Sequence, residues 1–166
     1  MTTKLVPTPA THAVFLITQG CLPMIFEPAA IAGASPIKAH TLTPQERSKI
    51  GLTAPGVTMG YRVDQTDVFV DMAGATATIW FAGGDFTTAA VLLEEWLRRI
   101  FPEDALTLRP VPAIPGKATI TREIAIEPAN TSRAALLSMT FGAPDAQGDD
   151  RMFFVRIYPQ ERQRAS

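Results

Sequence analysis

The sequence predicts an α+β fold: a mainly antiparallel, curved sheet of about six to seven strands packed on one long amphipathic helix. Two patterns carry this prediction. Apolar residues alternate with a period of two within residues 57–82 and again within 106–158, as in half-buried antiparallel strands. Between these blocks lies one segment, 86–101, whose apolar residues recur every three or four positions, as in a helix that buries one face.

Length, charge and cysteine content limit the possible classes. The 166 residues indicate a single domain, 1–166, with poorly ordered ends at 1–11 and 160–166. A net charge of −1 gives no global field for nucleic acid or an anionic membrane, so we expect neither partner. It also gives little repulsion between copies, which favours self-association. The single Cys21 cannot form an internal disulfide, which indicates a reducing, cytoplasmic location.

Apolar and partly β-branched residues near the N-terminus predict two strands, at 13–18 and 22–26. The longest uninterrupted apolar run, 13–17, is too short for a signal-peptide core or a membrane span. We therefore expect this region to be buried as part of the sheet.

A short surface helix is predicted over 44–50. Thr43 is a favourable N-cap, Pro44 fits the first helical position, and Glu46 completes a capping box. Gly51 is placed to end the helix in a left-handed conformation. These signals position a helix but carry no chemistry.

Three strands in a meander follow. The alternating segments 57–63, 68–72 and 77–82 are separated by the polar turn 64–67 and by Gly74. Short alternating segments joined by such turns are typical of antiparallel hairpins.

The helix over 86–101 has one apolar face and one charged face. Its charged side carries Glu94–Arg98 and Glu95–Arg99, two pairs with the i,i+4 spacing that favours ion pairing. The apolar face consists of Phe86, Ala89, Ala90, Leu93, Leu97 and Ile100. Burial of that face outweighs the exposed pairs, each of which contributes about 0.3–0.5 kcal/mol, so we expect the helix to lie on the sheet.

The C-terminal half predicts an edge strand at 106–111, since prolines limit pairing there, and three further strands at 118–127, 132–141 and 152–158. The sequence contains no internal repeat and no domain linker.

Three residues of a glycine-containing turn and one arginine are candidate ligand-binding residues. Gly83, Gly84 and Asp85 precede the long helix, where backbone amides and the helix dipole favour an anion; the alternative is a turn with Asp85 as the helix cap. Arg122 shares a strand face with isoleucines and could bind a carboxylate or phosphate in a bidentate manner. It could instead pair with an internal acid or extend to solvent.

His40, in a loop region, is a further candidate for ligand binding. Together with His12 and Cys21 it gives no metal-ligand spacing and no triad-like motif. We therefore expect no metal and no cofactor, and the chain is not predicted to be an enzyme.

Three functions are compatible with these observations. The first is a non-enzymatic interaction module that forms a homodimer, since the outward-facing Phe154 and Arg156 of the last strand are typical of a protein interface. The second is a protein that binds a small apolar or anionic ligand between sheet and helix. The third is an acyl thioester hydrolase, because a helix wrapped by an antiparallel sheet with glycines at its start is similar to the hot-dog thioesterases. The histidine usual before those glycines is Ala82 here.

Overall fold

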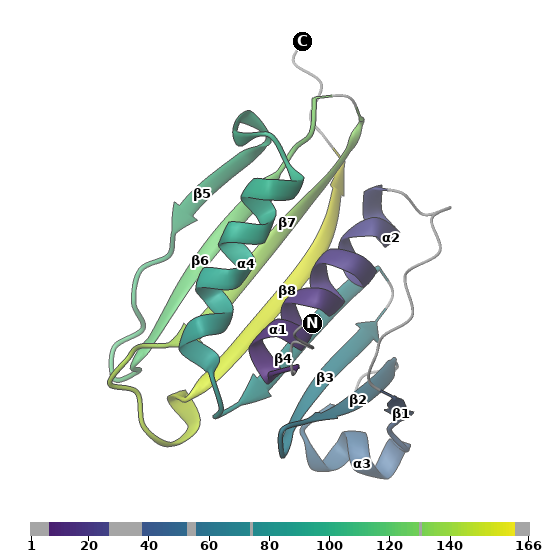
Figure 1. Cartoon of the computed structure of the whole chain (residues 1–166), viewed down its shortest axis with the longest axis vertical. Helices are drawn as coiled ribbons and strands as arrows, with labels where there is room; N and C mark the ends of the chain where they lie inside the picture. Colours follow the sequence, from purple (N-terminus) through teal and green to yellow (C-terminus); the bar gives the residue numbers. More distant parts are fainter. Residues whose placement is uncertain (1–6, 27–37, 53–55, 74, 130, 162–166) are drawn as a thin grey trace, which may run out of the picture.

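The fold is a single antiparallel sheet with two long helical segments on one face (Figure 1). This computed structural model describes residues 7–26, 38–52, 56–73, 75–129 and 131–161. The sheet has eight strands in the order β1-β2-β3-β4-β8-β7-β6-β5, and every neighbouring pair is antiparallel. The predicted α+β class is therefore confirmed.

The strands follow the predicted segments closely, with one short strand in addition. They are β1 Ala39–Thr41, β2 Val57–Val63, β3 Thr66–Ala73, β4 Thr76–Ala82, β5 Leu106–Pro110, β6 Thr119–Ile126, β7 Arg133–Gly142 and β8 Met152–Glu161. The edge strand predicted at 106–111 is β5, at one end of the sheet. The prediction missed β1, since three residues are too few to show a period.

Both helices that the sequence predicted, over 44–50 and 86–101, are present. The helices are α1 Pro9–Leu16, continued by a π-helical turn at Ile17–Cys21 and by α2 Leu22–Phe26, then α3 Pro44–Lys49 and α4 Phe86–Ile100. Short 3₁₀ turns lie at Glu103–Ala105 and Gly148–Asp150. The capping box of Thr43 and Glu46 is formed at the start of α3, as predicted.

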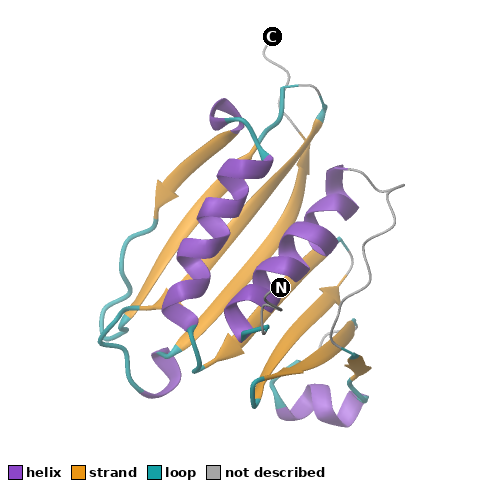
Figure 2. Ribbon diagram, viewed as in Figure 1, coloured by secondary structure: helices purple, strands orange, loops and turns teal. Residues whose placement is uncertain are grey.

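The elements form two similar halves. In each half a helix precedes four strands: α1 and α2 precede β1 to β4, and α4 precedes β5 to β8. The two four-stranded halves join through their last strands, β4 and β8, at the centre of the sheet. Figure 2 shows the two helical segments lying side by side across the same face. This duplicated arrangement is not visible as a repeat in the sequence.

The two strands predicted near the N-terminus are wrong, because residues 13–18 and 22–26 are helical. Thr8 and Thr11 form a capping box, with Pro9 at the first helical position. The helix contacts both the sheet and α4, so most of its surface is apolar and no helical period is visible. Within the end segments 1–11 and 160–166, the described residues Pro9 to Thr11 lie in α1, and β8 extends to Glu161.

The run Pro9–Phe26 is long and apolar enough to cross a membrane by length and composition, with 18 residues and a mean hydropathy of 1.3. The expectation that this region is too short to span a membrane rests on the five-residue run 13–17 and on its prediction as part of a strand. In the structure 56% of it is buried inside the protein. A helix that packs into a protein core has the same composition, so this is weak evidence for a membrane.

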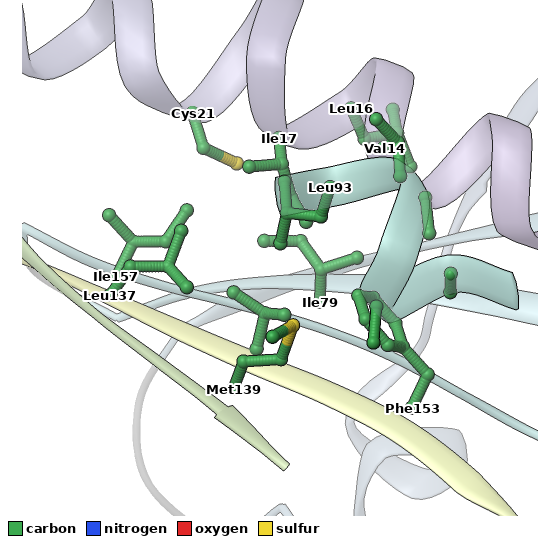
Figure 3. Packing of buried hydrophobic residues seen from close by; sticks show 14 of the residues in the cluster. Val14, Leu16, Ile17, Cys21, Ile79, Leu93, Leu137, Met139, Phe153 and Ile157 are labelled. Carbon is green, nitrogen blue, oxygen red and sulfur yellow. The ribbon is translucent and has the colours of Figure 1, made fainter. Parts of the chain in front are cut away.

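The core lies between the two helical segments and the sheet. Figure 3 shows Ile17 and Cys21 of the N-terminal segment and Leu93 of α4 above sheet side chains that include Leu137 and Phe153. Of these five, Ile17, Leu93, Leu137 and Phe153 have no exposed side-chain surface. The prediction that the long helix buries its apolar face on the sheet is confirmed, except at Ile100, which is 42% exposed at the end of α4.

The two ion pairs predicted along α4 are not formed among the described residues. Glu94 pairs instead with Arg122 of β6, and the Arg99 guanidinium lies 5.5 Å from the centroid of the Trp96 ring. A partner on the sheet holds Glu94 in a half-buried position, where charge pairing is stronger than on the exposed helix surface.

Candidate functional site

The turn at Gly83 to Asp85 leads into α4 and also contacts the first residues of α1. Gly83 and Gly84 adopt φ values of +69° and +59°, the left-handed region that glycine tolerates best. A Cβ on Gly84 would lie 3.5 Å from Pro9 Cγ. The Asp85 carboxylate accepts a hydrogen bond of 3.0 Å from the backbone N–H of Ala10, in the first turn of α1.

Asp85 therefore caps a different helix from the one that the sequence suggested. Its side chain makes no capping bond to α4, although it precedes that helix. The positive ends of the dipoles of α1 and α4 meet here, and a carboxylate already neutralises them. The position that an anionic ligand would take is occupied by Asp85.

Arg122 lies on the helix-covered face of β6, where the sequence placed it, and it has an internal partner. Its guanidinium forms an ion pair with Glu94 and lies 5.6 Å from the centroid of the Phe141 ring. This pairing satisfies the charge on an otherwise apolar face. Arg122 and Asp85 thus have separate structural partners and do not share a site.

His40 lies on the opposite face of the sheet, at its β1 edge. It pairs with Gly60 in the strand register, and its exposed ring covers that glycine so closely that a Cβ there would lie 2.7 Å from His40 Cε1. The absence of a side chain at Gly60 is what allows the imidazole to lie flat on the sheet.

An aromatic row begins next to this histidine and crosses the sheet. Gly60 lies opposite Phe69, Phe69 opposite Trp80, and Trp80 opposite Phe154. The ring centroids of Phe69 and Trp80 are 5.3 Å apart, and those of Trp80 and Phe154 are 6.5 Å apart. All three rings are half-buried. We call these three residues the aromatic row.

The aromatic row lies on the face of the sheet that α1, α2 and α4 leave uncovered, which we call the open face. Strand neighbours point alternately to the two faces, so Phe69, Trp80 and Phe154 point away from the core side chains beside them. The row continues into threonines on the next two strands, Thr140 and Thr121.

A polar row runs beside the aromatic row on the open face. Arg156 of β8 is exposed, and its guanidinium lies 5.3 Å from the centroid of the Phe154 ring. Ser138 of β7 lies opposite Arg156, Glu123 of β6 lies opposite Ser138, and Arg109 of β5 lies opposite Glu123. The row therefore carries a cation, a neutral hydroxyl, an anion and a second cation on four neighbouring strands.

Helix α3 lies at the β2–β3 end of the open face. Arg47 donates to Thr58 Oγ1 at 2.8 Å and to Asp71 Oδ1 at 3.1 Å, and Thr58 also donates to Asp71. This buried network holds α3 against the sheet. Asp71 is therefore a structural residue rather than one of a solvated strand face.

Sequence reasoning identified only part of this surface. It placed Phe154 and Arg156 outward, but it did not connect them with Phe69 and Trp80. The alternation put Phe69 and Trp80 out of phase with the core residues of their strands, which was the available signal. Their meeting with Phe154 depends on the pairing of β4 with β8, which no local pattern reveals.

The remaining titratable candidates belong to the core. His12 is 2% exposed and packs against the Tyr61 ring at 4.7 Å, and its Nε2 has no hydrogen-bond partner. Burial lowers the pKa of His12 to about 4 and raises the pKa of the Cys21 thiol to about 12. The imidazole and the thiol are therefore neutral near pH 7.

Two pockets lie between helices and sheet. One, of about 570 Å³, is formed between α4 and the strands β5 and β6, with Leu97 and Ile124 among its lining residues. The other, of about 540 Å³, lies beneath α2, with Cys21 and Met72 in its wall. Within the described ranges, no group of three or more histidine, cysteine, aspartate or glutamate residues could hold a metal ion.

Comparison of the chain with protein-family models, with curated proteins and with solved structures finds no match in any of the three. A function is therefore inferred from the open face, the two pockets and the turn Gly83 to Asp85.

Proposed function

We propose that this protein is a non-enzymatic interaction module that forms a homodimer through the open face of its sheet. The single observation that carries the proposal is the aromatic row, Phe69, Trp80 and Phe154, on a face that the long helices do not cover. Aromatic side chains together with arginine are enriched at the centres of protein interfaces.

The chemistry of the open face favours a protein partner. Trp80 and Phe154 can bury further apolar surface against a second copy, at roughly 25 cal/mol per Å² removed from water. Arg156, held over Phe154, offers a planar cation whose stem also adds apolar contact. The surrounding threonines and serine give a polar rim that can exchange water for hydrogen bonds.

The polar row makes the open face complementary to itself. Arg156 and Glu123 lie in one cross-strand row with Ser138 between them. A two-fold axis along β7 near Ser138 brings Arg156 of one copy over Glu123 of the other, and the reverse pair forms by symmetry. The same operation brings Arg109 over β4, beside Trp80, where a cation–π contact can form. The net charge of −1 adds little repulsion between the copies.

The acyl thioester hydrolase hypothesis gains no support from the geometry. The Asp85 carboxylate that it would use is engaged by the backbone N–H of Ala10. The buried, neutral Cys21 supports a reducing and hence cytoplasmic location, which we keep as part of the proposal.

A matched pair of tryptophan substitutions tests the dimer. Trp80→Glu removes the largest ring of the aromatic row and puts a charge beside the rings of Phe69 and Phe154, a loss that one surface ion pair, worth about 0.2–1 kcal/mol, does not offset. It is expected to yield a monomer, as measured by gel filtration with light scattering. Trp96→Glu makes the same change on the outer side of α4, where the side chain is 40% exposed, and should leave the dimer intact. Dimers of equal strength in both variants would overturn the choice of interface.

A further inference from the structure

The pocket beneath α2 is almost entirely apolar. It lies at the end of the sheet where β7 begins and β8 ends, and it measures about 540 Å³, within the range of roughly 300–1,000 Å³ typical of small-molecule sites. Cys21 and Met24 line it from the helical side, and Met72, Ala77 and Pro159 line it from the sheet. Thioether and thiol sulfurs are soft, adaptable contacts for a hydrocarbon chain.

Arg133 is the only charged residue among the described residues that line this pocket. Its Nη1 donates to the backbone carbonyl of Ile25, at 3.1 Å, near the end of α2. A guanidinium has five N–H donors, so others remain available for an anion. The remaining polar lining residue, Gln160, is exposed at the end of β8.

Helix α2 is short and only partly buried. It follows the π-helical turn Ile17–Cys21, contains Pro23, and buries Leu22, while Ile25 and Phe26 pack partly against the core. A second void, of about 150 Å³, lies on its other side, between Leu22 and Phe101. Short π-helical turns within α-helices are frequent at functional sites.

We propose that this pocket binds a free, unbranched alkyl chain that ends in a carboxylate. The chain lies between the methionines of α2 and β3, and the carboxylate meets the guanidinium of Arg133 at the mouth. Charge complementarity selects the anionic end, because no described acidic side chain lines the pocket. The apolar wall selects the hydrocarbon. This site lies apart from the aromatic row and does not depend on the homodimer.

The ligand is bound and not transformed. Cys21 is the only nucleophile in the wall that could be acylated, and burial keeps its thiol protonated, with a pKa of about 12. A protonated thiol is a poor nucleophile. The pocket is thus a retention site, and its occupancy can be measured without turnover.

Calorimetric titration of the whole protein with decanoate tests the proposal. Wild type is expected to bind decanoate, and Arg133→Gln should weaken binding by about tenfold or more, the loss expected for one charge-assisted hydrogen bond. Arg133→Lys keeps the charge and should retain most of the affinity. Arg99→Gln removes an exposed arginine on the outer side of α4 and is the matched control, with affinity unchanged. Decanol should bind wild type and Arg133→Gln equally.

Methyl NMR of protein labelled at the methionine methyl carbons locates the ligand. Decanoate bound in this pocket should shift the methyl resonances of Met24 and Met72, which line it. Ala75→Trp, at an exposed position on the rim, should abolish both binding and these shifts while the fold is retained. Absence of decanoate binding to wild type, or equal binding by Arg133→Gln and wild type, would overturn the proposal. Binding without a shift at either methionine would overturn the location.

Discussion

At the scale of one residue, a buried histidine whose Nε2 has no hydrogen-bond partner among the described residues makes the stability of this protein depend on pH. His12 packs between the rings of Phe15 and Tyr61, with centroid distances of 6.1 Å and 4.7 Å. Its pKa of about 4 lies below the value near 6.5 that an exposed histidine has. The neutral form is therefore favoured in the folded state, and protonation favours unfolding.

Lowering the pH from 7 to 4 should reduce the free energy of unfolding by roughly 3 kcal/mol through His12 alone. The stability that His12 contributes is fully present above about pH 6.5, which is its pKa in the unfolded chain, and it is lost as the pH falls toward the folded-state pKa of about 4. Urea titrations of wild type and His12→Phe across this range isolate it, because all other titratable groups are shared. Thr18→Val, at a buried polar residue of the same helical run that does not titrate, is the control and should keep the wild-type pH dependence.

An unchanged pH dependence in His12→Phe would contradict this account of His12. It would mean that carboxylates elsewhere in the chain produce the acid sensitivity.

At the scale of elements, one carboxylate holds two helices together. Asp85 begins α4 but caps α1, so the helical segments that form one face of the core share a single start point. The glycines before Asp85 bring it there, because their left-handed backbone turns the chain directly after β4. The Gly-Gly-Asp sequence thus serves helix packing.

Asp85→Ala should lower the free energy of unfolding by about 1–2 kcal/mol, since it leaves the Ala10 N–H without its acceptor and removes the charge at two helix starts. Asp85→Asn keeps an oxygen acceptor and should cost less. Chemical denaturation followed by circular dichroism gives the values. Asp104→Ala, at an exposed acid outside this turn, should change stability by no more than about 0.5 kcal/mol. Equal effects at Asp85 and Asp104 would contradict the shared cap.

Elements with a clear period could be predicted from the sequence, and elements without one could not. Helix α4 and the strands β2 and β8 each bury one face, so their alternation or helical period marks them. The N-terminal segment is apolar on several sides because it packs against both α4 and the sheet, and a short apolar run reads as a strand. The capping signal of Thr8 and Pro9 was present in the sequence and would have corrected the prediction.

At the scale of the whole molecule, two helix-plus-four-strand halves join at β4 and β8. This junction completes the aromatic row, because it places Trp80 of one half beside Phe154 of the other. The sequence could predict that each residue faces outward, from its phase within its own strand. It could not predict their contact, since long-range pairing is set by the assembly of the halves and not by a local pattern.

The same geometry separates the two proposed activities. The open face is available to a second copy, whereas the pocket beneath α2 lies at the end of the sheet on the helical side. A dimer formed through the aromatic row therefore leaves the mouth at Arg133 accessible. Decanoate should bind monomeric Trp80→Glu as tightly as it binds wild type, and titration calorimetry of the two proteins measures this directly. A loss of binding in Trp80→Glu would show that the two sites are coupled.

The proposal that the open face pairs with itself through Arg156 and Glu123 can be tested by exchanging these two charges. Sedimentation equilibrium should show a dimer for wild type, weaker association for Arg156→Glu and for Glu123→Arg, and a restored dimer for the double variant, in which the pair is reversed. A wild-type protein that remains a monomer at every concentration, or a double variant no better associated than either single variant, would contradict the account.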